Sequence, residues 1–412
     1  MGKKKFRLAT LGCRTNQYET QAYRDQLTQI GYLEAKEGEE AELCIVNTCT
    51  VTDSADRRSR HQIRQLIRQN RGAQVVVTGC LAEQPPDWLQ DIEGISMIFP
   101  NQDKEELIAH LFPNEEIPEF SIKHFEAHTR AFVKVQDGCN SFCSYCIIPY
   151  VRGRSRSRPI QDVVHEVTGL VNNGYKDIVI TGINVGDYEW GLANLMRNLD
   201  KIDGLARLRL SSIDPDEVDD ELMETVLNGK HTCHSLHIVL QSGSNVILKK
   251  MNRKYTRQIF YETIEKLQRA SPYFTFTTDV IVGFPGETDA DFEETLQVMK
   301  EVQFAKVHMF PYSRRKRTRA NLYPRQISQD IINTRKAKLM QVAEQEAFAL
   351  REKYVGKIMS VLTESHSLGH TENFLTVLLD QREEIVANEL INMRLVKNTP
   401  EGLIGIIDSH CS

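Results

Sequence analysis

The chain has 412 residues, of which 41% are hydrophobic and 26% are charged, and its formal net charge at pH 7 is −5. These proportions are typical of a soluble globular protein with two or three domains, and the net charge gives no general indication of a nucleic-acid partner. All apolar runs are shorter than the roughly 20 residues of a membrane span, and the N-terminus lacks the apolar core of a signal peptide. We therefore predict a cytoplasmic protein with no membrane partner, in which cysteines bind metals or react more often than they form disulfides.

Residues 1–122 alternate strand-like and helical segments, which predicts a Rossmann-like parallel sheet covered by helices. Three successive strand-like runs end in a cysteine: FRLATLGC at Cys13, ELCIVNTC at Cys49 and QVVVTGC at Cys80. Ligands of open parallel sheets lie at the carboxyl ends of the strands. We therefore predict that the three thiols share one metal site, although a single cysteine at such a position is more often a small buried hydrophobe.

Residues 123–130 are predicted to be a linker, and residues 131–345 contain six strand-like runs with helical segments between them. The runs are AFVKVQD, DIVITG, RLRLSS, SLHIVLQ, FTFTTDVIVGF and KVHMFPY. Six units of this kind predict a partial (β/α)6 barrel of the TIM type, whose active site lies at the C-terminal ends of its strands. Polar residues follow several of these strands, although any one of them alone is better explained as a helix cap.

The first of these strands leads into DGCNSFCSYC, which spaces Cys139, Cys143 and Cys146 as C-x3-C-x2-C. A closed zinc or iron–sulfur site takes four protein ligands, and the next His or Cys is His165, beyond an arginine-rich run. Three thiolates on a four-iron cluster leave one iron open to a small molecule with amino and carboxylate groups. Tyr145 would place an aromatic ring beside such a cluster, where an adenine can pack. Zinc held by three cysteines and a distant histidine remains the alternative.

Residues 346–412 form a third predicted unit, in which a long helical segment ends near Lys353 and short β-like runs follow. The runs are KIMSVLTE, NFLTVLLD, EEIVANELI and EGLIGIID. Their spacing predicts a small OB-like β-barrel of the kind that binds oligonucleotides. A barrel of this kind without a ligand remains an alternative.

Three clusters of arginine are candidates for RNA contact. Helical periodicity places the first cluster along one face of a predicted helix beside a predicted metal site: Arg57, Arg60, Arg64 and Arg68. The second lies in the run RGRSRSR after the second cysteine motif: Arg152, Arg154, Arg156 and Arg158. The third includes Arg317 and Arg319, in PYSRRKRTRANLYPR. A solvated amphipathic surface remains an alternative for the first cluster, as do intramolecular carboxylate pairs for the second.

These motifs resemble a known family. The motif C-x3-C-x-aromatic-C after a first barrel strand is similar to that of the radical S-adenosylmethionine (SAM) superfamily, and the surrounding sequence resembles its methylthiotransferase branch. LGCRTN, VNTCTVT and VVVTGC match the second cysteine set of that branch, while VGKIMSVLTE and GHTENFLTVLL match its C-terminal TRAM RNA-binding domain. Side motifs such as VRGRSRSRP, TGINVGDY and VGFPGE most resemble the enzymes that convert N6-threonylcarbamoyladenosine (t6A) at position 37 of tRNA to its 2-methylthio form.

The resemblance implies two [4Fe-4S] clusters, one on each cysteine set, and SAM as cofactor. Cleavage of SAM would yield a radical that removes hydrogen from C2 of the adenine, where a methylthio group is inserted. No catalytic residue is implied beyond the cluster-bound cofactors. Family likeness places Thr181 and Gly182 at the methionyl amino end of SAM, and Ser212, Gln241 and Asp279 near the rest of it. The implied partners are tRNA and an electron donor such as flavodoxin or ferredoxin, and we expect a monomer.

Two features of the sequence leave alternatives open, one for the function and one for the conformation of a loop. Sister branches that act on isopentenyladenosine in tRNA or on a ribosomal-protein aspartate share the cysteines, and a zinc-stabilised RNA-binding protein without catalysis is the most distant alternative. The third basic run departs from the family pattern, because Arg317 stands where the family has a glycine before Thr318. If that glycine makes a tight turn, Arg317 either distorts the turn or adopts a left-handed conformation at some cost.

Overall fold

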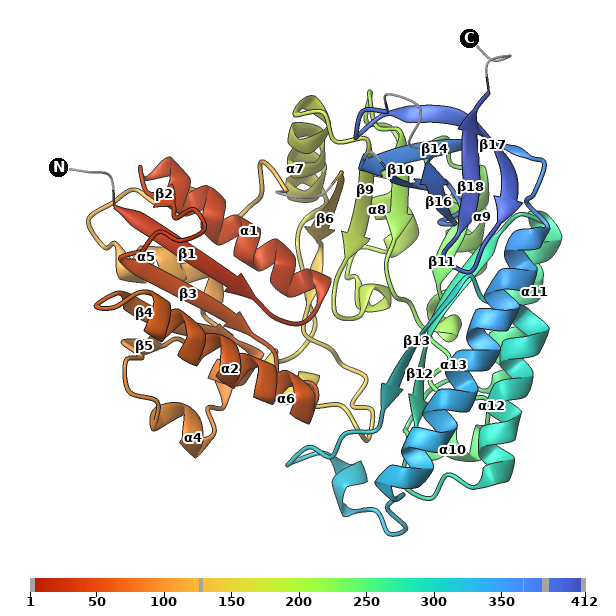
Figure 1. The fold of residues 1–412 in the computed structure, drawn as a ribbon, viewed down its shortest axis with the longest axis horizontal. Coiled ribbons are helices and arrows are strands. Elements are labelled where there is room, and N and C mark those ends of the chain that lie inside the picture. The colour runs from red at the N-terminus through yellow and green to blue at the C-terminus, as the bar shows by residue number, and fades with distance from the viewer. Residues whose placement is uncertain (1–3, 126–128, 366, 380–384, 409–412) are drawn as a thin grey trace.

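The computed structural model describes residues 4–125, 129–365, 367–379 and 385–408 and arranges them in the three predicted parts (Figure 1). In these segments no helix is both long enough and apolar enough to cross a membrane. The first part is a parallel sheet in the order β2-β1-β3-β4-β5. Its strands are β1 (Lys5–Thr10), β2 (Leu33–Glu34), β3 (Leu43–Thr48), β4 (Gln74–Gly79) and β5 (Met97–Ile98).

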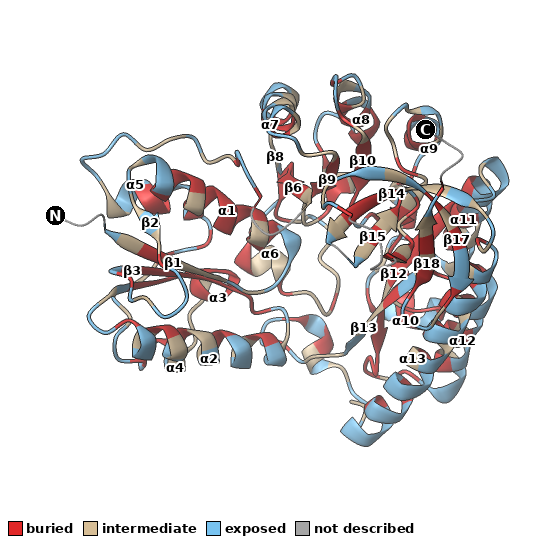
Figure 2. Ribbon diagram, turned by 45° about the horizontal axis from the view of Figure 1, so that its top comes forward, coloured by how far each residue is buried: buried red, intermediate tan, exposed pale blue. Residues whose placement is uncertain are grey.

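Helices cover both faces of this sheet, as predicted. They are α1 (Arg14–Gln29), α2 (Asp53–Gln69), α3 (Cys80–Glu83), α4 (Asp87–Gln90) and α5 (Leu107–Leu111), with a 3-10 turn η1 (Lys104–Glu106). Helices α1 and α2 lie on opposite faces (Figure 2). Tyr23 of α1 belongs to one apolar cluster and Ile63 of α2 to another, because strand side chains alternate between the two faces. The hydroxyl of Thr52 caps α2 by accepting a hydrogen bond from the amide of Ala55 at 3.1 Å.

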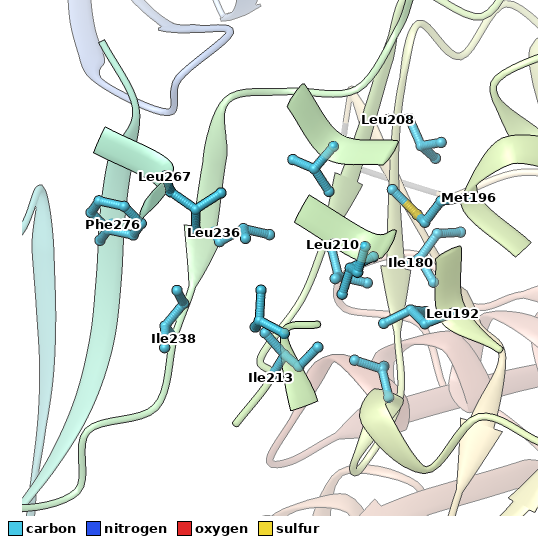
Figure 3. Packing of buried hydrophobic residues seen from close by; sticks show 14 of the residues in the cluster. Ile180, Leu192, Met196, Leu208, Leu210, Ile213, Leu236, Ile238, Leu267 and Phe276 are labelled. Carbon is cyan, nitrogen blue, oxygen red and sulfur yellow. The ribbon is translucent and has the colours of Figure 1, made fainter. Parts of the chain in front are cut away.

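The second part is the predicted six-stranded partial barrel. Its strands are β6 (Arg130–Lys134), β9 (Asp177–Thr181), β10 (Arg207–Leu210), β11 (Ser235–His237), β12 (Thr275–Val282) and β13 (Lys306–Pro311). They form two parallel three-stranded sheets, β10-β9-β6 and β11-β12-β13, which parallel bridges such as Ile213–Ile238 connect. Ile180, Leu208, Ile238 and Phe276 belong to the core between strands and helices (Figure 3).

Helices follow the barrel strands around the outside (Figure 1). They are α7 (Ile160–Asn172), α8 (Leu192–Leu199), α9 (Asp220–Asn228), α10 (Asn245–Lys250), α11 (Arg257–Ala270), α12 (Asp289–Val302) and α13 (Gln329–Glu352). Shorter elements in the loops are β7 (Gln136–Asp137), α6 (Ile148–Val151), β8 (Arg156–Ser157), η2 (Val185–Asp187), η3 (Pro215–Glu217) and η4 (Arg319–Leu322).

The third part is a closed barrel in the order β14-β15-β16-β18-β17. Its strands are β14 (Ile358–Ser365), β15 (Leu368–Thr371), β16 (Thr376–Leu379), β17 (Leu390–Asn398) and β18 (Leu403–Ile407). The strand predicted over residues 383–391, in the run EEIVANELI, is wrong in position. Strand β17 begins only at Leu390, and residues 383 and 384 lie outside the described segments. Asn388 has φ +65°, a turn conformation that asparagine tolerates.

Helix α13 links the second and third parts. Leu339 and Ala343 belong to the core of the partial barrel, whereas Leu350 belongs to the core of the small barrel. The boundary predicted between residues 345 and 346 therefore falls inside one continuous helix that contributes to both cores.

Candidate active site

The cysteines of the first part lie at adjacent strand ends. Cys13 follows β1 and precedes α1, Cys49 follows β3, and Cys80 opens α3 directly after β4. Strands β1, β3 and β4 are parallel neighbours, so their carboxyl ends share one edge. Burial raises the pKa of Cys80 to about 12, and the nearby Cys49 and Cys13 add to the increase while Arg152 opposes it. The three thiols therefore lie within electrostatic reach of one another.

The turn before Cys13 is shaped for close approach. Gly12 has φ +101°, and a Cβ at this position would lie 2.7 Å from Cβ and 3.0 Å from Sγ of Cys49. Gly79, before Cys80, has φ +88°, and a Cβ there would lie 2.5 Å from backbone atoms of Thr48. Only glycine combines these left-handed conformations with such contacts. The two glycines thus allow the three cysteine-bearing turns to converge.

The second cysteine set lies in the loop after β6 and β7. Gly138, with φ +72°, precedes Cys139, and a Cβ on it would lie 2.1 Å from the carbonyl oxygen of Arg154. The amide of Ser141 donates to Sγ of Cys139 at 3.4 Å, and Nη1 of Arg253 donates to Sγ of Cys143 at 3.0 Å. Burial raises the pKa values of Cys139 and Cys146, and their thiol neighbours raise them further. These three thiols also form one local group.

Both groups present three soft donors, as an iron–sulfur cluster requires. Thiolates are the usual ligands of such clusters, each bound to a separate iron. Within the described segments, no three His, Cys, Asp or Glu side chains lie close enough together to hold a single metal ion. The donor type and the turns therefore fit clusters at both places.

Two adjoining cavities lie next to the cysteines and share Asp279 and Phe310. The larger, of about 470 Å³, is lined by residues of all three parts, from Cys13 through the barrel strands to Phe374. Four of the residues expected around SAM line it: Thr181, Gly182, Ser212 and Asp279. The smaller, of about 200 Å³, is lined by Tyr145, Cys146 and Gln241. The structure thus brings all six expected SAM residues to one connected region.

The wall of the smaller cavity includes Gln241, which has a strained backbone conformation and an unpaired side-chain oxygen. Gln241 has φ +60°, and its buried Oε1 has no hydrogen-bond partner among the described residues. A non-glycine residue in the left-handed region is costly and is typical of functional sites. Tyr145, which lines the same cavity, packs its ring edge-on against Phe284, with the centroids 6.4 Å apart. An apolar slot with one orphaned amide oxygen suits a flat ligand that offers a hydrogen-bond donor.

Several residues of the larger cavity were not found from the sequence. His237 lies 3.3 Å from Asp279, measured from Nε2 to Oδ1, and His308 is the register partner of Asp279 on the neighbouring strand. Burial lowers the pKa of His308 to about 4, so this imidazole is neutral near pH 7. The signal was the alternation along β11 and β13, which turns every second residue toward one face and so brings His237 and His308 to the cavity. Arg14, Arg130, Arg209 and Phe374 are among the other lining residues that were not found.

The assignment of Arg152 to an RNA surface is wrong. Arg152 is 0% exposed, and its Nη1 donates to Glu19 at 3.0 Å and to Asp137 at 2.8 Å, while Nε donates to Sγ of Cys80 at 3.2 Å. Arg158 is similarly engaged, since its Nη1 donates to Glu166 at 2.6 Å. For these two residues the alternative of intramolecular carboxylate pairs holds, because Glu19 and Asp137 lie against Arg152 and Glu166 of α7 lies against Arg158.

The remaining arginines of the second and first clusters differ in surroundings. Arg154 and Arg156 are exposed, and the guanidinium of Arg154 lies 4.4 Å from the ring centroid of Phe142. Arg57, Arg64 and Arg68 are exposed on α2, whereas Arg60 is half-buried, with its guanidinium 4.2 Å from the ring of Trp88. Their contact with RNA stays a prediction.

The third basic run is anchored by Arg315. Its guanidinium donates to Asp53, to Asp56 and to the carbonyl of Thr50, each at 2.6 Å, so it fastens the loop after β13 to the first part. Arg317 is exposed with φ +73°, which confirms the left-handed alternative predicted for an arginine at a glycine position. Arg319 is exposed as well.

Comparisons with known proteins agree with this architecture. Residues 133–299 match the radical SAM superfamily, and residues 5–100 match the uncharacterized protein family UPF0004. Among solved structures, the radical SAM methyltransferase TsrM from Kitasatospora setae is similar with a TM-score of 0.57 at 16% identity, over 78% of this chain and 77% of that one. The cobalamin-dependent SAM radical enzyme OxsB is similar with a TM-score of 0.52 at 11% identity, over 82% and 56%. At these identities the likeness is one of fold.

Curated relatives are similar over nearly the whole chain. Threonylcarbamoyladenosine tRNA methylthiotransferase MtaB of Chlamydia pneumoniae is 48% identical over 411 residues, 98% of each chain. The protein of the same name in Bacillus subtilis is 35% identical over 94% of this chain and 93% of the relative. A tRNA-2-methylthio-N(6)-dimethylallyladenosine synthase of Clostridium novyi is 34% identical over 98% and 96%.

The partial barrel, the three-thiol loop after its first strand and the match over residues 133–299 define a radical SAM protein. Proteins of this class use a [4Fe-4S] cluster and SAM. More specifically, the chain belongs to the radical SAM methylthiotransferase family, because the similarity to MtaB extends over the first and third parts as well as the barrel.

Proposed function

We propose that the chain inserts a methylthio group at C2 of N6-threonylcarbamoyladenosine at position 37 of tRNA. The observation that carries this proposal is the 48% identity, over 98% of both chains, to a relative named as the threonylcarbamoyladenosine tRNA methylthiotransferase MtaB. Relatives named as dimethylallyladenosine synthases are 33–34% identical. The similarity therefore favours the threonylcarbamoyl substrate over the isopentenyl one.

We further propose two clusters, one at Cys139, Cys143 and Cys146 and a second at Cys13, Cys49 and Cys80. When bound, these groups and SAM supply the cleavage of an aromatic C–H bond that side-chain acids and bases cannot open. The larger cavity reaches Cys13, whereas the smaller reaches Cys146, and both reach Asp279. This arrangement supports a substrate held between the two cysteine sets.

The residues of the chain would bind and orient the reactants. We assign the adenine of SAM to the apolar slot beside Tyr145, with Gln241 as a hydrogen-bond acceptor. Thr181, Gly182, Ser212 and Asp279 would bind the polar end of SAM. At Gly182 a Cβ would lie 2.9 Å from Oε1 of Gln136, so a larger residue would press on the side chain that accepts hydrogen bonds from the amides of Ile183 and Asn184. A volume of about 470 Å³ falls within the range of about 300–1,000 Å³ that is usual for small-molecule pockets.

The experiment that tests this function is anaerobic reconstitution with iron, sulfide, SAM, a reductant and tRNA that carries t6A. Mass analysis of the nucleosides should show the 2-methylthio derivative of t6A. Product only on isopentenyladenosine tRNA, or a ribosomal protein that gains a methylthio group, would establish a sister substrate instead. Colourless protein that contains zinc and no iron would contradict the whole class of reaction.

The partners follow from the same chemistry. Reductive cleavage of SAM consumes an electron that the adenine does not supply, so we propose an external donor such as flavodoxin or ferredoxin. All three parts of a single chain line the larger cavity, which supports a monomeric enzyme.

Charge reversal of the exposed pair Arg317 and Arg319 is expected to weaken tRNA binding. Each lost phosphate contact lowers the slope of log K against log salt by about 0.7–0.9, so the double variant should lose about 1.5 from the slope. Salt titrations of tRNA affinity for R317E/R319E and for wild type provide the measurement. Reversal of Arg269 and Lys300, exposed on the outer helices α11 and α12, is the matched control. Equal slopes for wild type and R317E/R319E would remove this run from the RNA surface.

A further inference from the structure

Of the arginines that line the larger cavity, Arg14 forms no ion pair with any residue that the structure describes. Three arginines line this cavity: Arg14, Arg130 and Arg209. Arg130 forms an ion pair with Glu364, and Arg209 forms one with Asp177 at 2.9 Å. Arg14 forms no ion pair and no hydrogen bond through its side chain with any described residue, and its guanidinium only lies over the ring of Phe132, 5.0 Å from the centroid.

The surroundings of Arg14 favour an anion. Arg130 and Arg209 line the same cavity, so three guanidinium groups contribute positive charge to its walls. Among the described residues, Asp279 is the one carboxylate that lines this cavity; it attracts Arg14 but lies against His237, at 3.3 Å. A negative group that enters the larger cavity would therefore meet a positive field without displacing an existing ion pair.

Neutral polar groups beside Arg14 point to the same kind of ligand. Ser211, Ser212, Ser235 and Thr277 line the cavity with hydroxyl groups. Oγ of Ser211 is buried and has no hydrogen-bond partner among the described residues. Buried polar atoms are rarely left unpaired, so an orphaned hydroxyl in a cavity wall indicates a missing polar partner. The cavity is thus suited to a ligand with both a negative charge and hydrogen-bonding groups.

We propose that Arg14 binds the carboxylate of the amino-acid substituent on N6 of the target adenine, and thereby selects a carboxylate-bearing adenine over one with a neutral N6 substituent. This inference rests on the proposed function and adds the residue that would read the substituent. C2 and the N6 substituent lie on the same edge of an adenine ring, on either side of N1. Arg14 follows Cys13 directly and lines the same cavity, so an adenine held with C2 toward this cysteine set would bring its N6 substituent near Arg14. A guanidinium can bind a carboxylate through two parallel hydrogen bonds.

The test compares the binding of anticodon stem-loop RNAs by reconstituted protein. One RNA carries t6A, a second carries the same nucleoside with its carboxylate converted to a carboxamide, and a third carries unmodified adenosine. Wild type should bind the t6A RNA at least about tenfold more tightly than the carboxamide RNA, a difference of about 1.4 kcal/mol. Arg14→Gln should bind both with equal affinity, whereas Arg14→Lys should retain part of the preference.

Arg64→Gln is the matched control, because it removes an exposed arginine from the same part of the protein, outside the cavity. Arg64→Gln should leave the ratio between the two RNAs as in wild type, even where it weakens both. Equal binding of t6A and carboxamide RNAs by wild type would overturn the inference, and so would an unchanged ratio in Arg14→Gln. Either of these two outcomes overturns only the role of Arg14, provided that wild type still converts t6A to its methylthio form. If wild type does not convert t6A, the proposed function is itself wrong.

Discussion

Replacing Arg152 with methionine is expected to lower the free energy of unfolding by about 3–5 kcal/mol, because removal of one partner from a buried ion pair leaves uncompensated charge. Arg152 holds the carboxylates of Glu19 and Asp137, and all three side chains are nearly or fully buried. Lys104 and Lys134 contact the same two carboxylates, Lys104 at 2.8 Å from Glu19 and Lys134 at 3.7 Å from Glu19 and 3.8 Å from Asp137. Lys134 also pairs with Glu105, so without Arg152 three carboxylates share two ammonium groups. Urea denaturation of wild type and R152M, monitored by circular dichroism, provides the measurement.

Arg156→Met is the matched control. Arg156 lies in the same run, is exposed, and forms no ion pair among the described residues. Exposed substitutions of this kind change stability by about 0.5 kcal/mol or less. A loss in R152M that is no larger than the loss in R156M would show that the buried network is not needed for stability.

The same network predicts a dependence on pH. Burial alone would raise the pKa of Glu19, but Arg152 and Lys104 hold it at about 2, and they hold that of Asp137 well below its usual range. Because these folded-state values lie below the unfolded ones of about 4, the stability is fully present above about pH 4.5 and is lost as the pH falls toward 2. Wild type should therefore lose stability steeply over this interval, and R152M should lose less.

The sequence allowed the fold and the cysteines to be predicted, because both depend on local patterns. Alternation of strands and helices specifies a parallel sheet, and a cysteine at the end of a strand stays at that edge whatever else packs around it. Arg152 could not be assigned in this way. Its partner Glu19 is 133 residues distant in the chain, and only the packing of α1 against the barrel brings the two together. A run of arginines looks alike in sequence whether its members are exposed or buried.

The cavity residues show the same limit. Arg14 lies in a motif that was read for Cys13 alone, and its surroundings come from β6, β10 and the small barrel, which are far from it in sequence. Phe374, in the loop after β15, reaches the cavity because Arg209 of β10 donates to the carbonyls of Thr371 and Glu372. Polar contacts between the two barrels have no periodicity, so a single sequence does not reveal them.

Replacing Cys49 with alanine is expected to abolish formation of the methylthio nucleoside while cleavage of SAM continues. Cys49 belongs to the set at the ends of β1, β3 and β4, whereas Cys139, Cys143 and Cys146 form a separate loop of the barrel. A cluster held by only two thiolates should be lost from the first part, so the variant keeps only the cluster of the barrel loop. Its iron and acid-labile sulfide should therefore be about half of the wild-type content. Cys143→Ala should also retain about half, but should lose cleavage of SAM together with the product.

Cys44→Ala controls for the loss of a buried thiol. Cys44 lies in β3, the same strand that leads to Cys49, and it is 0% exposed but distant from the strand end. This variant should keep its full iron content and its product, because its thiol fills space inside the sheet, away from the strand-end thiols. Full iron content and full product in Cys49→Ala would show that the first part holds no cluster. Sulfur insertion would then need a source within the barrel, and the convergence of Gly12, Gly79 and three thiols at one sheet edge would need another explanation.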